Sequence, residues 1–139
     1  MEIRVDEYTS PVLVKISADK NLDEALEIMQ ENGVRHLPVE HNGKIVGIVS
    51  ERDLMAFMGK DWTSMVKIED IMNINILSVY ASENLGEVAL QLSSQKVGSA
   101  LVLDENGDVY GIFTTTDALN ALVEILYPSA NKKSELKEL

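Results

Sequence analysis

The stretch GIVSERD at residues 47–53 returns as GIFTTTD at residues 111–117, an offset of 64 residues. In both copies, a glycine and two apolar residues precede a hydroxyl residue, and an aspartate follows three positions later. Flanking sequence repeats as well, since NLDE at residues 21–24 matches NLGE at residues 84–87. An internal duplication constrains the fold before any single residue does. The chain therefore contains two homologous units.

The duplication sets the domain organisation. We place the two units at residues 5–60 and 68–127, with a linker at residues 61–67 and a polar tail at residues 128–139. A unit of about sixty residues buries only about 60% of its unfolded surface and is marginal alone. We therefore expect the two copies to pack with pseudo-twofold symmetry as one domain.

Local patterns predict a β-α-β-β-α order in each copy and hence an α+β fold. Asn21 followed by Glu24 is a capping-box pattern, and Gly33 suits a left-handed residue at a helix end. Asn42-Gly43 is typical of a tight hairpin. The first copy is expected to have strands at 12–16, 36–39 and 45–49 and helices at 22–32 and 51–59; the second, strands at 76–79, 99–103 and 109–113 and helices at 85–95 and 115–126.

Composition excludes several classes of protein. With 45% hydrophobic and 25% charged residues, the chain has enough apolar material for a core. It has no cysteine, which excludes disulfides and thiol catalysis. The net charge of −11 argues against binding to nucleic acid or to anionic membranes. No apolar run approaches twenty residues and no signal peptide is visible, so we expect a cytoplasmic protein.

The repeated heptad has two physical interpretations. Ser50 and Thr114 can be helix N-caps, with Asp53 and Asp117 completing capping boxes. Alternatively, the hydroxyl and the free N–H groups of a helix start form an anion site, beside which the aspartate accepts hydrogen bonds from a ribose diol. Both interpretations hold if a ligand competes with the cap.

The repeated unit resembles the cystathionine-β-synthase (CBS) domain, in the tandem arrangement often called a Bateman module. The heptads carry this resemblance, together with VRHLPV at residues 34–39 and DIM at residues 70–72. It covers about residues 5–127. The resemblance implies a regulatory sensor of adenosine ligands, usually AMP, ADP or ATP and sometimes S-adenosylmethionine, which bind in two clefts between the repeats.

By position, the resemblance implies roles for residues around the first heptad. Asp53 matches the ribose-binding aspartate, Ser50 the hydroxyl near the phosphate, and Arg52 a position that often faces phosphate. Arg35 and His36 lie on the strand that lines the central cleft. We assign Val12 and Leu13, whose main chain would read the adenine edge, to this same first cleft.

The second heptad carries the corresponding residues of the second cleft. Thr114 and Asp117 correspond to Ser50 and Asp53, while Thr116 replaces Arg52. Asn75 and Ile76 replace Val12 and Leu13, and Gly98 and Ser99 replace Arg35 and His36. The second cleft thus keeps the ribose and hydroxyl groups without cations of its own, and it would borrow Arg35 or prefer an uncharged adenosine ligand.

Alternatives to ligand sensing remain. A CBS pair without ligand would serve as an interaction scaffold. An enzyme is disfavoured because no hydroxyl has an adjacent base. The two histidines, His36 and His41, lack a third ligand at zinc-site spacing, so we expect no metal.

The regulated activity would belong to a partner that the sequence does not identify. The helices after the heptads are expected to form a C₂ homodimer through apolar residues. These are Leu54, Met55, Phe57 and Met58 in the first copy and Leu119, Leu122, Val123, Leu126 and Tyr127 in the second.

Overall fold

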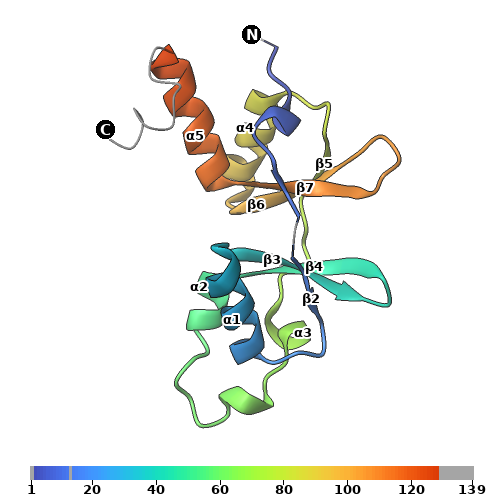
Figure 1. Cartoon of the computed structure of the whole chain (residues 1–139), viewed down its shortest axis with the longest axis vertical. Coiled ribbons are helices and arrows are strands. Elements are labelled where there is room, and N and C mark those ends of the chain that lie inside the picture. The colour runs from blue at the N-terminus through green and yellow to red at the C-terminus, as the bar shows by residue number, and fades with distance from the viewer. Residues whose placement is uncertain (1, 13, 129–139) are drawn as a thin grey trace. The chain divides into compact units, whose positions relative to one another are not determined.

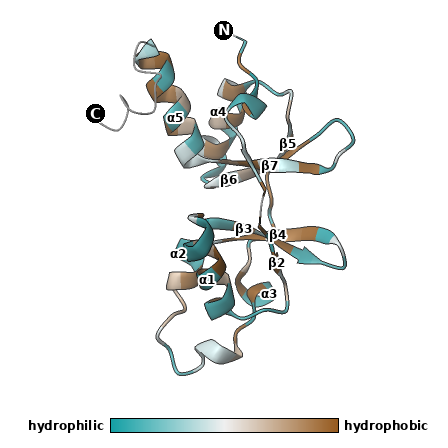
Figure 2. Cartoon of the chain, viewed as in Figure 1, coloured by the Kyte–Doolittle hydropathy of each residue, from teal (hydrophilic) through white to brown (hydrophobic). Residues whose placement is uncertain are grey.

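The computed structural model describes residues 2–12 and 14–128, which form two compact units (Figure 1). One unit, here the first-repeat unit, consists of residues 14–76. The other, the second-repeat unit, combines residues 2–12 with residues 77–128. Both are α+β, with apolar strands and polar hairpin tips (Figure 2).

The first-repeat unit is built on a three-stranded sheet of order β2-β3-β4. β2 is parallel to β3, and β3 is antiparallel to β4. Helices α1 and α2 lie on one face of this sheet (Figure 1). The elements are β2 (Ile16–Ser17), α1 (Leu22–Asn32), β3 (His36–His41), β4 (Lys44–Ser50), α2 (Glu51–Met55), a 3-10 turn (Thr63–Met65) and α3 (Ile68–Ile71).

Local sequence explains the bounds of α1. The Asn21 side chain accepts a hydrogen bond from the Glu24 N–H at 2.9 Å and caps the helix start. Gly33 ends the helix with φ of 63°, a left-handed conformation that glycine adopts without steric cost. The Asn42-Gly43 hairpin tip also has positive φ at both residues, as a type I′ turn requires. These three predictions are confirmed.

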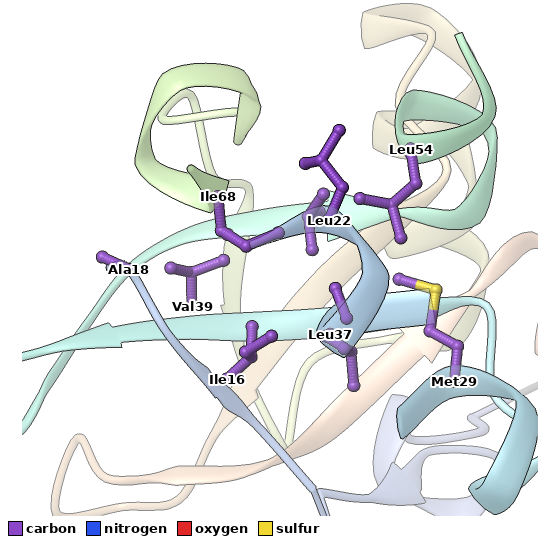
Figure 3. Packing of buried hydrophobic residues seen from close by; sticks show 10 residues of the cluster. Ile16, Ala18, Leu22, Met29, Leu37, Val39, Leu54 and Ile68 are labelled. Atoms are coloured by element: carbon purple, nitrogen blue, oxygen red, sulfur yellow. The ribbon is translucent and has the colours of Figure 1, made fainter. Parts of the chain in front are cut away.

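The core of this unit lies between the helices and the sheet. Leu22 and Met29 of α1 and Leu54 of α2 point toward Leu37 of β3, and Ile68 of α3 packs against the same cluster (Figure 3). All five side chains are at most 1% exposed. Burial of this apolar area is the main stabilising term for a unit of this size.

The second-repeat unit has a four-stranded sheet of order β1-β7-β6-β5. Helices α4 and α5 lie on one face of it (Figure 1). Its core gathers nine buried residues, among them Val5, Val79, Leu92 and Phe113. The elements are a 3-10 turn (Val5–Glu7), β1 (Ser10–Pro11), β5 (Ser78–Tyr80), α4 (Leu85–Gln95), β6 (Ser99–Leu103), β7 (Val109–Thr114) and α5 (Thr115–Leu126).

The segment before the first strand of each repeat packs in the unit formed by the other repeat. We call these lead-in segments, at residues 4–11 and 67–74. The Val5 N–H donates to the Glu83 carbonyl at 2.8 Å, and its counterpart Ile68 donates to the Lys20 carbonyl at the same distance. The compact units therefore do not follow the boundaries of the sequence repeats.

Each lead-in also pairs with the strand that ends in the repeated motif. Ser10 lies opposite Ile112 of β7, and Asn73 forms the equivalent bridge to Ile48 of β4. Gly111 and Gly47, which open the two heptads, leave room for this approach. A Cβ at Gly111 would lie 2.4 Å from the Ser10 carbonyl oxygen, and one at Gly47 would lie 2.6 Å from Met72 Sδ. Only glycine accommodates the lead-in backbone without displacement.

Two expected elements are wrong. A continuous strand at residues 12–16 does not form, because residues 10–11 pair with β7 and residues 16–17 with β3. The helix expected to reach Gly59 ends at Met55. The Thr63 hydroxyl donates to the Phe57 carbonyl at 2.7 Å, and this loop contact replaces the next helical turn.

The early end of α2 also corrects the expected dimer face of the first copy. Leu54 is fully buried, and Phe57 and Met58 pack against the core of the first-repeat unit. Of the four apolar residues proposed there, Met55 alone is exposed, at 57%. The apolar spacing after the first heptad is therefore explained by the core.

Candidate functional site

The start of α2 is the first candidate site. Ser50 ends β4, and its Oγ accepts a hydrogen bond from the Asp53 N–H at 3.1 Å. In return, Asp53 Oδ2 accepts from the Ser50 N–H at 3.2 Å. Both residues are half-buried, and the capping interpretation is confirmed. Asp53 Oδ1 accepts no hydrogen bond from any residue that the structure describes.

Basic residues flank this helix start. His36 lies opposite Ser50 in the β3–β4 register and is half-buried. The preceding residue, Arg35, is exposed, and its carbonyl accepts a hydrogen bond from the Glu51 N–H at 2.8 Å. Arg52, in the first turn of α2, is exposed as well. Within residues 2–12 and 14–128, neither arginine belongs to an ion pair.

The start of α5 is the second candidate site, and its hydrogen bonding is denser. Asp117 Oδ2 accepts from the Thr114 N–H at 2.8 Å and from the Thr114 hydroxyl at 3.0 Å. The Thr114 Oγ1 accepts from the Asp117 N–H at 3.3 Å. Asp117 Oδ1 accepts from the Ser10 hydroxyl at 3.4 Å. Both oxygens of this carboxylate are therefore engaged.

The neighbours of the second helix start are neutral. Ser99 lies opposite Thr114 in the β6–β7 register and is 8% exposed. The Gly98 carbonyl accepts from the Thr115 N–H at 3.1 Å, as the Arg35 carbonyl does from Glu51. Thr116 is exposed. The structure thus groups Ser99, Thr114 and Asp117 just as it groups His36, Ser50 and Asp53.

The residues that directly follow the lead-ins fall in the opposite units from those assigned by sequence. Val12 follows β1 in the second-repeat unit, with Asp117, whereas Asn75 and Ile76 belong to the first-repeat unit, with Asp53. Our pairing of Val12 with the first heptad, and of Asn75 and Ile76 with the second, is therefore reversed. The exchange of the lead-ins is the physical reason. Leu13 lies outside the described residues.

Sequence reasoning missed two side chains that hold the lead-in to α5. Ser10 contacts Asp117 as described, and the Tyr8 hydroxyl donates to Glu124 Oε2 at 2.5 Å. This hydrogen bond, with burial, raises the pKa of Tyr8 to about 12. Neither residue has a polar counterpart with the same contact in the second copy, so the repeat pattern gave no signal for them.

Comparison with known proteins identifies the repeated unit. The model of the CBS domain family matches residues 5–60 and residues 68–124. A CBS domain-containing protein of Dictyostelium discoideum is 28% identical over 140 residues, which cover 92% of this chain and 97% of that protein. The crystal structure of CBSX2 in complex with AMP superposes with a TM-score of 0.73 at 30% identity, covering 88% of this chain and 98% of that one.

Other relatives are longer than this chain. An uncharacterized protein of Methanocaldococcus jannaschii is 27% identical over 127 residues, and the match covers 83% of this chain and 45% of that protein. The chain thus spans about half the length of that relative. Some further matches are enzymes of which only a part aligns with this chain. No helix in the described ranges has both the length and the apolar character needed to cross a membrane.

Proposed function

The chain belongs to the CBS domain family, with two CBS domains in tandem, and from this premise we propose that it is a regulatory module that binds an adenosine nucleotide at the start of α2. The ribose diol would donate to Asp53, and the phosphate would be bound by the Ser50 hydroxyl and by Arg35 and Arg52. The adenine edge would face main-chain groups of Asn75 and Ile76, which belong to the same unit as Asp53. Binding would then regulate a separate partner protein.

The observation that carries this proposal is Asp53 Oδ1, the carboxylate oxygen to which no described residue donates. A carboxylate has about four acceptor positions, and the cap uses one of those on Asp53. Vicinal hydroxyls of a ribose can therefore bind Oδ1 through charge-assisted hydrogen bonds while the helix stays capped. Arg35 and Arg52 offer guanidinium donors that suit a phosphate. The AMP bound to CBSX2 supports the same ligand class.

A titration with nucleotides tests the proposal. AMP at about 100 times its dissociation constant should add roughly 2.7 kcal/mol of stability and raise the melting temperature by several degrees. GMP should add little. Asp53→Asn keeps a capping oxygen, so unfolding free energy should change by less than about 1 kcal/mol, while calorimetry should show a loss in affinity of about tenfold.

The same titration distinguishes nucleotide binding from the second candidate function, a ligand-free interaction scaffold. If AMP, ADP, ATP and S-adenosylmethionine all give neither heat nor a thermal shift, the ligand-free scaffold is the better account. Loss of folding in Asp53→Asn with unchanged affinity would restrict this aspartate to its capping role.

We also propose that α5 mediates a C₂ homodimer. Leu119, Leu122 and Leu126 are 56%, 49% and 63% exposed, and brown bands recur along this helix between teal ones (Figure 2). An apolar surface of this kind marks an interface. Leu122→Glu should give monomers by light scattering, whereas Asn120→Glu, on an exposed polar residue of the same helix, should not. A monomeric wild-type protein at tens of micromolar contradicts the dimer.

A further inference from the structure

The two aspartates differ in how many of their acceptor positions the protein itself occupies. Among the described residues, the Asp53 carboxylate accepts one hydrogen bond, from the Ser50 N–H. Asp117 accepts three, two from Thr114 and one from Ser10. Only the Ser10 contact comes from outside the capping motif, and it takes the oxygen that is open on Asp53. A carboxylate has about four acceptor positions, so a ribose diol that donates two hydrogen bonds to Asp117 must displace the Ser10 hydroxyl, which has no equivalent at Asp53.

Several contacts hold Ser10 in this position. Its backbone pairs with Ile112, and its carbonyl oxygen lies so close to Gly111 that no side chain fits there. Two residues earlier, Tyr8 is bonded to Glu124, two helical turns beyond Asp117 on α5. The lead-in is thus fixed to β7 through its backbone and to α5 through Tyr8, which keeps the Ser10 hydroxyl beside the carboxylate.

The corresponding residue in the first-repeat unit makes a different contact. Asn73 bridges to Ile48 as Ser10 pairs with Ile112, but Asn73 Oδ1 accepts from the Asn75 N–H at 2.9 Å. The Asn73 side chain is therefore bonded within its own turn. No described residue thus takes, at Asp53 Oδ1, the place that Ser10 takes at Asp117 Oδ1.

We propose that Ser10 is an internal competitor for ribose at Asp117, so that an adenosine nucleotide fills the site at Asp53 first and the site at Asp117 only at higher concentration. This inference rests on the proposed function and adds an order of occupancy to it. Ser10 acts through Asp117 and is a positioning residue. Positions 98 and 116 carry no arginine, so a phosphate should bind less tightly near Asp117 than near Asp53. This difference favours the same order of occupancy.

Calorimetric titration with AMP tests this order. The wild-type protein should show two classes of site, and Asp53→Asn should weaken the tighter one. In the Asp53→Asn background, Ser10→Ala should raise the affinity of the remaining site by about three- to tenfold, a modest gain because the 3.4 Å contact is long. Ser10→Thr restores the hydroxyl and should return the affinity to the level of that background.

Matched controls distinguish the possible failures. In the same Asp53→Asn background, Asn73→Ala, at the equivalent position of the other unit, should leave the affinity of the remaining site at Asp117 unchanged, and melting temperatures without AMP show whether each variant is folded. Two equal sites that Ser10→Ala does not alter would overturn the order of occupancy and leave the proposed function intact. Weaker binding in Ser10→Ala would overturn it too, because Ser10 would then contact the ligand. No AMP binding to the wild-type protein would remove both proposals.

Discussion

The two units share a backbone plan but attach their lead-ins with different chemistry. In the second-repeat unit, the side chains of Tyr8 and Ser10 bond to α5. In the first-repeat unit, Ile71 and Met72 of the lead-in pack against the apolar core instead. Duplication has therefore preserved the backbone contacts while the side chains diverged. The carboxylate at the start of α5 thus receives a hydrogen bond from its lead-in, whereas among the described residues the one at the start of α2 receives none.

The greatest loss of stability should follow the removal of a buried lead-in side chain. Ile68 is fully buried in the core of the first-repeat unit, although the sequence repeat places it at the head of the second copy. Ile68→Ala should destabilise that unit by about 2–5 kcal/mol through lost burial and a cavity. Trp62, the only tryptophan, lies in the same unit, so urea unfolding followed by its fluorescence reports the change.

Met65→Ala is the matched control, because Met65 lies three residues earlier and is 80% exposed. It should shift the urea midpoint little. An unchanged Trp62 transition in Ile68→Ala would contradict the exchange of lead-ins.

Substitution of the two heptad glycines should change the unfolding free energy by a smaller amount. A Cβ at Gly111 meets backbone, the Ser10 carbonyl oxygen, which cannot move without breaking β1 from β7. At Gly47 the nearest atoms belong to the flexible Met72 side chain. Gly111→Ala should cost about 1–3 kcal/mol by overpacking, and Gly47→Ala should cost less. Equal urea midpoints for the two variants would contradict this difference, because both lead-ins would then accommodate the added Cβ equally well.

Loss of the Tyr8–Glu124 hydrogen bond should change the unfolding free energy least. Tyr8→Phe should lower the unfolding free energy near neutral pH by about 1–2 kcal/mol. In the folded protein, the pKa of Tyr8 rises from 10.0 to about 12, so the protonated phenol is favoured. Its contribution is fully present below pH 10 and is lost as the pH rises toward 12.

Chemical denaturation of the wild type and Tyr8→Phe between pH 8 and pH 12 measures this slope. The difference in stability between the two proteins should shrink as the pH rises. A constant difference would mean that the phenol proton plays no part in holding the lead-in. Tyr110→Phe is a suitable control, since Tyr110 is exposed and makes no hydrogen bond through its hydroxyl among the described residues.

Much of the fold could be predicted because its signals are local. The helices at residues 85–95 and 115–126 and the strand at residues 99–103 begin and end where the apolar spacing and caps indicated. Asn84 and Thr114 each cap a helix by accepting from an N–H three residues on. Such contacts lie within a few residues, so the sequence pattern contains them.

The lead-ins could not be predicted because their partners are distant along the chain. Residues 12–16 alternate loosely enough for a strand, but the pattern does not say which strand is the neighbour. The structure pairs residues 10–11 with β7 and residues 16–17 with β3, and this division moves Val12 to the other unit. The Ser10–Asp117 contact joins residues 107 positions apart. The residues of each site were therefore foreseeable, but not their grouping.

The exchange of lead-ins also sets an order on folding during synthesis. Residues 14–76 are contiguous, so the first-repeat unit can close as soon as its own residues have left the ribosome. Val5 is synthesised before this unit, yet it is buried with Phe113 in the second-repeat unit. Its side chain must therefore stay outside a core until residue 113 has been made, and this long-range closure should limit the folding rate.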